Sequence, residues 1–364
     1  MLEPSMIFFG SAIIKRFMRS KHPHYFSLFR SLCVGVLFIA SATHAPDPVG
    51  ANAPFYLPEA PQRSDQVEVI YRDFADPGRH NWKETGPRPL RTMIWRPSKS
   101  IVARRLPLIL ISHGSGGLGT HMSWLGNVLA SKGYIAAAVD HNGTFEEELN
   151  SRPTPSDHFG WERTRDLSVV LDFLLKDPEL GRLIDEECVG AAGFSLGGTT
   201  VLWLAGARLD MRHLQRNAPP VPEAIAPAIG ALLDLPRTNG TARHAQGRSE
   251  QSFRDARVRS VFALAPAMGF GFTQEGLRDI HVPVQIVVGS EDQVTPASEN
   301  AGHFAKYIND ARYLVLPGER GHFSAATPEE SRPPAMQEVA GLATAFFDEK
   351  LRKSSESTCP VITD

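Results

Sequence analysis

The segment Val189–Gly198, which reads VGAAGFSLGG, decides the fold of this chain. Its first half is a continuous apolar run, as expected for a strand buried on both faces. The apolar spacing that follows predicts a helix beginning at Leu196. Ser195 therefore lies in a tight strand-to-helix turn between Gly193 and Gly197. Such a turn forces its central residue into strained backbone angles, and small flanking residues avoid clashes there.

The segments on either side of this turn alternate between predicted strands and predicted helices. Strands are predicted at Gln66–Tyr71, Arg91–Trp95, Leu106–Ser112, Tyr134–Val139, Ser260–Ala265, Val282–Val288 and Arg312–Leu316. Helices are predicted over about His121–Ser131, along the apolar stripe Leu167–Leu175 and over about Ala335–Leu351. Repeated β-α units imply a mostly parallel sheet with helices on both faces. The Pro/Gly-rich stretch Asp76–Pro89 is expected to be a loop between the first two strands.

One stretch interrupts this alternation. Residues 208–256 contain a cluster of prolines followed by a polar run. We interpret them as a small cap inserted into a single domain that spans 65–352, with 353–364 as a C-terminal tail.

The N-terminus predicts export. Basic residues precede an apolar run of 11 residues, Leu32–Ala42, which is far shorter than the ~20 residues that span a bilayer. Ala40-Ser41-Ala42 supplies the small-x-small pattern of a cleavage site. We therefore predict a cleaved signal peptide over 1–42 and a periplasmic or secreted protein with no membrane span in the mature chain. The alternative is an uncleaved amphipathic anchor.

The mature chain is expected to begin with an extended arm, 43–64, which is rich in Pro and Ala. The sequence has three cysteines, too few for a disulfide scaffold. Cleavage removes Cys33, so a mature disulfide could only join Cys188 and Cys359. Cys188 lies at the start of an apolar run and is expected to be a small core residue, with its pairing left open.

Composition excludes several classes of protein. The 364 residues are 42% hydrophobic and 21% charged, which is incompatible with a disordered chain. The 38 Lys and Arg residues against 40 Asp and Glu give a formal net charge of -2. No surplus of positive charge is left to drive binding to nucleic acid or to an anionic membrane surface.

Three side chains in the predicted loops suit nucleophilic catalysis. A serine hydroxyl is a poor nucleophile at neutral pH and needs a base. His322 follows the last predicted strand, and Asp292 follows the strand before it, so both lie where ligands bind in open parallel sheets. An acid such as Asp292 would hold the imidazole in one tautomer. Ser195, Asp292 and His322 are thus predicted as nucleophile, acid and base, with Glu291 as the carboxylate next in sequence to the acid.

An oxyanion hole is expected from two backbone N–H groups. One belongs to Leu196, the residue after the nucleophile. The other is expected at Ser115, in the loop His113–Gly117 that follows strand Leu106–Ser112. Main-chain donors suit this task because they are fixed before charge develops.

The same glycine-rich loop supports a rival interpretation. Gly114–Gly119 matches G-x-G-x-x-G, and Asp140 ends the next strand about twenty residues later, as in a dinucleotide-binding fingerprint. Two observations argue against a nicotinamide-dependent oxidoreductase. The fingerprint usually follows the first strand of its domain, whereas here two other strands come earlier in the chain. The chain also supplies a complete Ser/Asp/His set, which a dehydrogenase would not need.

Several motifs together resemble a known family. HGSGG, VDHNGT, RTRDLSVVLDFL, GAAGFSLGG, FALAPAM and VVGSEDQVTP are similar to those of bacterial predicted dienelactone hydrolases, which are relatives of platelet-activating-factor acetylhydrolases and polyester hydrolases. The resemblance covers about residues 66–350. It implies an α/β-hydrolase fold and a serine esterase that uses no cofactor or metal. It also implies a small-molecule, lipid or polyester ester as the substrate.

Two departures from the family matter. Dienelactone hydrolases use a cysteine nucleophile, whereas this chain has Ser195, so a dienelactone substrate is not implied. In the animal platelet-activating-factor enzymes the acid lies one strand earlier, and here the matching segment Ala263–Met268 has no carboxylate. This leaves Asp292 as the acid and weighs against a phospholipid substrate. The alternative from another class is a non-catalytic binding protein on the same fold.

Overall fold

The structure is a computed structural model that describes residues 66–98, 105–144, 154–221, 223, 226–317, 321–322 and 334–352. The predicted signal peptide (1–42), the predicted arm (43–64) and the tail (353–364) lie outside the described residues.

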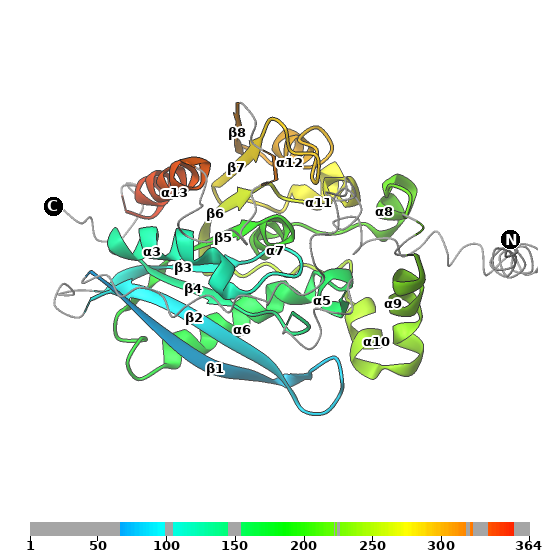
Figure 1. Cartoon of the computed structure of the whole chain (residues 1–364), viewed down its shortest axis with the longest axis horizontal. Helices are drawn as coiled ribbons and strands as arrows, with labels where there is room; N and C mark the ends of the chain where they lie inside the picture. Colours follow the sequence, from blue (N-terminus) through cyan, green and yellow to red (C-terminus); the bar gives the residue numbers. More distant parts are fainter. Residues whose placement is uncertain are drawn as a thin grey trace, which may run out of the picture.

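Eight strands form one sheet in the order β1-β2-β4-β3-β5-β6-β7-β8. They are β1 (Val67–His80), β2 (Pro87–Pro97), β3 (Leu106–Ser112), β4 (Ile135–Val139), β5 (Ile184–Phe194), β6 (Val258–Leu264), β7 (Val284–Gly289) and β8 (Arg312–Leu316). β2 pairs antiparallel with β1 and with β4, and every later pair of neighbours is parallel. Helices surround the sheet, as Figure 1 shows. The predicted mostly parallel architecture is confirmed.

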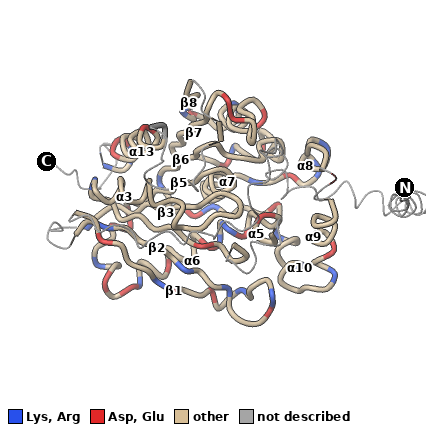
Figure 2. The backbone as a smooth tube through the Cα atoms, in the orientation of Figure 1, with Lys and Arg blue, Asp and Glu red and all other residues tan. Residues whose placement is uncertain are grey.

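The helices of the domain follow the strands in chain order. They include α3 (Ser123–Ser131), α5 (Pro155–His158), α6 (Glu162–Lys176), α7 (Leu196–Ala205), α11 (Gln274–Leu277), α12 (Ala301–Tyr307) and α13 (Pro334–Phe347). The helix expected from His121 begins two residues later, at Ser123, because Gly119–Met122 form a separate 3-10 turn. Short α11 and α12 were not predicted, since few apolar positions in them repeat. Lys/Arg and Asp/Glu are interspersed along the chain rather than separated by sign (Figure 2).

The prediction that Asp76–Pro89 forms a loop is wrong at both ends of this segment. β1 and β2 extend through it and leave only residues 81–86 as the turn. The ladder shifts register between Asp76 and His80, and the Asp76 carboxylate accepts a hydrogen bond from Gly78 N–H at 2.8 Å. This irregularity accommodates Pro77 and Gly78, and an edge strand tolerates a proline because one side of it has no partner strand.

The described residues of the insertion predicted over 208–256 form three helices: α8 (Met211–Asn217), α9 (Ala226–Thr238) and α10 (Gly240–Gln246). Figure 1 shows them on the side of the molecule where α5 lies. The side chain of Asn239 donates to Trp82 O at 2.8 Å, and Thr241 N–H donates to Glu84 at 2.7 Å. Trp161 also donates to Ala245 O at 2.9 Å. The insertion is therefore attached to the β1–β2 turn and to the start of α6.

Strand β5 is longer than the apolar run suggested, and Cys188 lies inside it rather than at its start. The Cys188 side chain is fully buried, so the expected core position is confirmed. Cys188 is also disulfide-bonded, and its partner lies outside the described residues. Among the described residues, no helix is both long and apolar enough to cross a membrane.

Candidate active site

Ser195 lies between β5 and α7 in a strained backbone conformation. Its φ of 56° and ψ of -121° lie outside the regions that non-glycine residues ordinarily adopt. A side chain on Gly193 would collide with the Gly197 carbonyl, and one on Gly197 would collide with the carbonyls of Ser112 and His113. Both glycines are therefore required by close backbone approach rather than by their own dihedral angles.

Asp292 and His322 are in direct contact. His322 Nδ1 lies 2.9 Å from Asp292 Oδ2. The Asp292 side chain is fully buried, whereas the His322 side chain is 16% exposed. An imidazole whose Nδ1 faces a buried carboxylate has its Nε2 left to exchange protons with another group. Glu291, the neighbouring carboxylate, is exposed to solvent.

Thr295 orients Asp292 and was missed by sequence reasoning, although the Asp-x-x-Thr spacing was available as a signal. Its N–H donates to Asp292 Oδ1 at 2.8 Å and its hydroxyl donates to Oδ2 at 2.9 Å. Burial raises the pKa of Asp292, but the hydrogen bond and charge of His322, together with the Thr295 donors, outweigh it and lower the pKa overall. Asp292 is thus held as a carboxylate facing the imidazole.

The strand-to-helix turn and His322 are neighbours. The ring of Phe194 lies 4.8 Å, between centroids, from the His322 ring. A Cβ placed on Gly114 would lie 3.2 Å from the Phe194 ring and 3.4 Å from Ser195 Cβ. The loop after β3, the Ser195 turn and His322 therefore meet at one place in the fold.

The two expected oxyanion donors lie next in sequence to residues of this meeting point: Leu196 follows Ser195, and Ser115 follows Gly114. Leu196 is the first residue of α7, and the first N–H groups of a helix have no partner within it. Ser115 lies in the loop after β3, and its hydroxyl donates to Asp157 Oδ1 at 2.7 Å. Asp157 is buried on α5 and was not predicted as a site residue.

Asp140 takes part in the loop that suggested a dinucleotide site. Its Oδ1 accepts a hydrogen bond from Gly119 N–H at 2.6 Å. The acidic residue of the supposed fingerprint thus binds its own glycine loop, where a nicotinamide enzyme would use it on a ribose. This contact favours a structural role for the pattern Gly114–Gly119.

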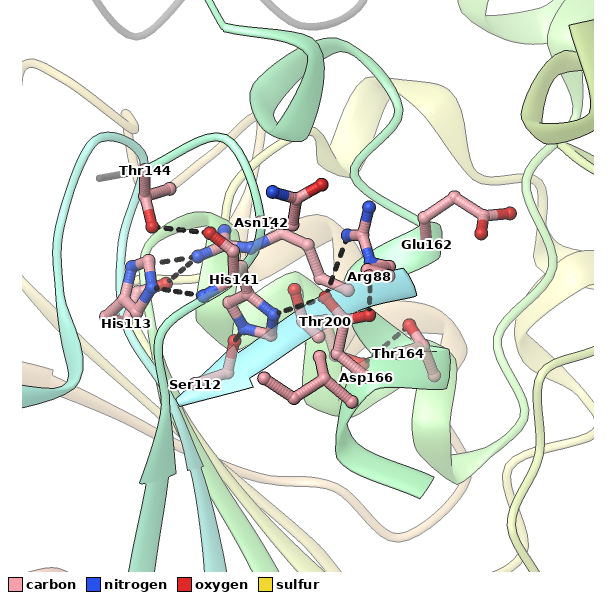
Figure 3. Close-up of polar contacts among 12 residues, drawn as sticks. Arg88, Ser112, His113, His141, Asn142, Thr144, Glu162, Thr164, Asp166 and Thr200 are labelled. Carbon is pink, nitrogen blue, oxygen red and sulfur yellow. Dashed lines mark hydrogen bonds and ion pairs between the residues drawn. The ribbon is translucent and has the colours of Figure 1, made fainter. Parts of the chain in front are cut away.

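A buried polar network joins residues of β2, α6 and the end of β3 (Figure 3). Asp166 accepts two hydrogen bonds from Arg88, at 2.7 and 2.9 Å, and one from Arg79 at 2.6 Å. His141 Nδ1 lies 3.0 Å from Asp166, and Ser112 Oγ lies 2.9 Å from His141 Nε2. His141 is thus a structural histidine just after the end of β4. The sequence did not predict this network.

Three histidines in this region are fully buried. Burial, and for the first two the positive charge of Arg163, lowers the pKa of His113 well below its usual value and that of His141 to about 3. Burial alone lowers the pKa of His158 to about 4. Below pH ~6.5 the unfolded chain binds protons at these residues and the native state does not, so acidification favours unfolding. Asp140 opposes this in part, because burial raises its pKa to about 6.

We expect His158→Leu to lose less stability than wild type between pH 8 and pH 5. Neither ring nitrogen of His158 has a hydrogen-bond partner in the described part of the chain, so the substitution breaks no such bond. Each pH unit below 6.5 costs the native state roughly 1.4 kcal/mol at one neutral buried histidine. Between pH 8 and pH 5, the unfolding free energy of wild type should fall by about 2 kcal/mol more than that of the variant, as measured with urea at both pH values. Equal falls in the two proteins would contradict this prediction.

Within the described ranges, no group of three or more His, Cys, Asp or Glu side chains is arranged to hold a metal ion.

This chain is similar to several known hydrolases. A family model described as platelet-activating factor acetylhydrolase, isoform II, matches residues 94–145, which include β3, the loop with Ser115 and β4. Cutinase est1 of Thermobifida alba is 32% identical over 106 residues, which are 29% of this chain and 32% of that protein. Cutinase 2 of Thermobifida cellulosilytica is 30% identical over 138 residues, 35% of this chain and 47% of that protein. The chain spans less than half the length of these curated relatives.

A solved structure covers more of the chain. The dienelactone hydrolase from Anabaena variabilis superposes with a TM-score of 0.50 at 18% identity, over 79% of this chain and 100% of that one. This likeness shows the fold, which is that of an α/β hydrolase. The expected resemblance to platelet-activating-factor acetylhydrolases, dienelactone hydrolases and polyester hydrolases is confirmed.

Proposed function

We propose that this α/β-hydrolase-fold protein is a serine esterase that cleaves carboxylic esters through an acyl-enzyme. The observation that carries the proposal is the Asp292–His322 pair, joined at 2.9 Å beside the strained Ser195 turn. A buried carboxylate that orients a partly exposed imidazole next to a serine on a strand-to-helix turn is the arrangement that activates a hydroxyl.

The chemistry follows from these positions. Ser195 Oγ attacks the ester carbonyl carbon while His322 Nε2 takes the hydroxyl proton. The N–H groups of Ser115 and Leu196 bind the oxyanion of the tetrahedral intermediate. The protonated imidazole then gives its proton to the departing alcohol, which leaves an ester between Ser195 and the acyl group. Water, deprotonated by the same histidine, hydrolyses that ester and restores the serine.

The substrate class is a carboxylic ester, and relatives named cutinases favour an extended apolar or polymeric ester over a phospholipid. The three-helix insertion attached beside α5 is proposed to act as the cap that shapes the acyl pocket. A series of p-nitrophenyl esters from acetate to palmitate, with a short-chain phospholipid and an aliphatic polyester in parallel, tests this assignment. If the protein hydrolyses none of these substrates, the proposed function is wrong.

A second candidate is a binding protein that retains the fold without catalysis. The strained backbone of Ser195 beside the Asp292–His322 pair argues against it, because a non-glycine residue held in a sparsely populated conformation is typical of a functional site. A fluorophosphonate probe separates the two, since a protein without an activated serine is not labelled.

Export is proposed on two grounds. The N-terminal pattern is that of a signal peptide, and Cys188 is disulfide-bonded, a state that persists in oxidising compartments. Cleavage would remove Cys33 and leave Cys359 as the remaining partner for Cys188. A non-reducing peptide map that joins Cys188 to Cys33 would contradict cleavage before folding.

We expect the mature protein from its native host to begin near Thr43 or Pro46. Ala40-Ser41-Ala42 ends just before the first of these positions, and a second candidate pattern, Thr43-His44-Ala45, ends just before the other. Intact mass measurement with N-terminal sequencing checks this directly. Retention of Met1 or Met18 at the N-terminus would defeat the export proposal.

A further inference from the structure

Arg163 is an arginine of α6 that is fully buried. Its Nη2 donates to His113 O at 2.6 Å and to Gly114 O at 3.3 Å, whereas its Nε and Nη1 have no hydrogen-bond partner in the described part of the chain. The charges of Asp157 and Asp166 raise the pKa of Arg163 through space. Burial lowers the pKa of Arg163 to about 10, so it stays protonated at neutral pH. A buried cation without a bonded carboxylate destabilises a fold, so stability does not explain this residue.

Arg163 Nη2 donates to two consecutive carbonyls, and the longer of the two contacts, at 3.3 Å to Gly114 O, reaches the peptide that carries the proposed oxyanion donor. Gly114 C=O and Ser115 N–H are the two ends of the same peptide, and Ser115 N–H is the proposed oxyanion donor. A donor on the carbonyl end polarises the peptide and strengthens its N–H as a donor. The Ser115 hydroxyl, donating to Asp157 at 2.7 Å, anchors the residue on its other side.

The His113 ring lies against the same carbonyl. Its Nδ1 is 2.7 Å from Gly114 O and 2.9 Å from Arg163 Nη2, and its Nε2 accepts from His141 N–H at 3.4 Å. A bond from Arg163 needs the lone pair of Nδ1, whereas a bond to Gly114 O needs a proton on Nδ1, so the ring makes one of these two bonds at a time. Figure 3 shows His113 together with His141 and Asp166. Arg163 is therefore the donor to the Gly114 carbonyl from which the inference is drawn.

We propose that Arg163 is a positioning residue of the oxyanion hole, which holds the Gly114–Ser115 peptide in place and polarises it toward the developing oxyanion. The proposal rests on the proposed esterase function and adds a residue to its machinery. Arg163 does not touch the substrate, so its effect should appear in the transition state and not in ground-state binding.

The test compares Arg163→Met, Arg163→Gln and Arg163→Lys with Arg88→Met. Arg88 is an equally buried arginine of the same network, but its described contacts are with Asp166 and the Trp82 ring rather than with the Ser115 loop. Loss of an oxyanion donor costs ~10²–10³ in kcat, and a weakened one should cost ~10–100-fold. We expect Arg163→Met to lower kcat by about this factor with KM within about threefold of wild type. Arg163→Lys, which retains a hydrogen-bond donor without the planar guanidinium, should recover part of kcat.

A transition-state analogue supplies the readout that a purely structural role would not move. A trifluoromethyl ketone forms a hemiketal anion that occupies the oxyanion hole, whereas the carboxylate product does not need it. Among the variants that fold, the inhibition constant of the ketone should rise in proportion to the loss of kcat/KM, and that of the product should stay constant. Arg88→Met should lose stability but keep kcat within about fivefold of wild type.

The proposal is overturned if Arg163→Met or Arg163→Gln keeps wild-type kcat, or if Arg88→Met loses as much kcat as they do. It is also overturned if ketone and product affinities fall together. A wild-type protein that is inactive on every ester and unlabelled by fluorophosphonate refutes the proposed function instead.

Discussion

Ser195→Ala is expected to lower kcat for ester hydrolysis by ~10⁴-fold or more while the protein stays folded. The substitution removes the attacking oxygen and little else, because the Ser195 side chain makes no capping hydrogen bond to α7. Removing a methyl-sized polar group from the turn should leave the free energy of unfolding almost unchanged. Initial rates on a p-nitrophenyl ester, normalised to folded protein, measure the effect.

Ser131→Ala is the matched control for this experiment. Ser131 is an exposed serine at the end of α3 that donates only to Val128 O, and its loss should not change kcat. Activity of Ser195→Ala within tenfold of wild type would refute the hydrolase assignment.

Asp292→Asn is expected to cost ~10³–10⁴-fold in kcat. Asparagine keeps the shape of the side chain but can present an amide N–H to His322 Nδ1, which selects the wrong tautomer and no longer stabilises the imidazolium. The loss should be greatest near neutral pH. Initial rates at about pH 8, where a free histidine is neutral, measure it without a protonation difference.

Glu291→Gln is the control beside it, because this residue is the adjacent carboxylate and is exposed. It should cost less than tenfold in kcat at the same pH. If Glu291→Gln were the inactive variant and Asp292→Asn the active one, the acid would be misassigned by one residue while the esterase proposal survived.

The fold could be predicted because its signals are local. The apolar runs of β3, β5 and β7 are each long enough to identify a strand buried on both faces, and their alternation with helices implies parallel pairing. The turn around Ser195 was recognisable because Gly193 and Gly197 lack room for a side chain. Asp292 and His322 were expected to face each other, and the structure places them 2.9 Å apart.

The buried polar network could not be predicted, because its members lie far apart in the sequence. Arg79, Arg88 and Asp166 each look like ordinary surface residues until β1, β2 and α6 bring them together. The same network explains the error over Asp76–Pro89. Buried ion pairs of Arg79 and Arg88 stabilise strands that local Pro and Gly residues disfavour, and tertiary contacts outweighed local propensity there.

Covalent labelling of the active serine is the sharpest test of the esterase proposal. Wild-type protein and Ser195→Ala are treated with a fluorophosphonate probe at pH 8, digested, and mapped by mass spectrometry. We predict a single stoichiometric adduct, on the hydroxyl of Ser195 in the peptide that contains GFSLGG, and none in the variant. An unlabelled wild-type protein, or an adduct on any other residue that persists in Ser195→Ala, would contradict it.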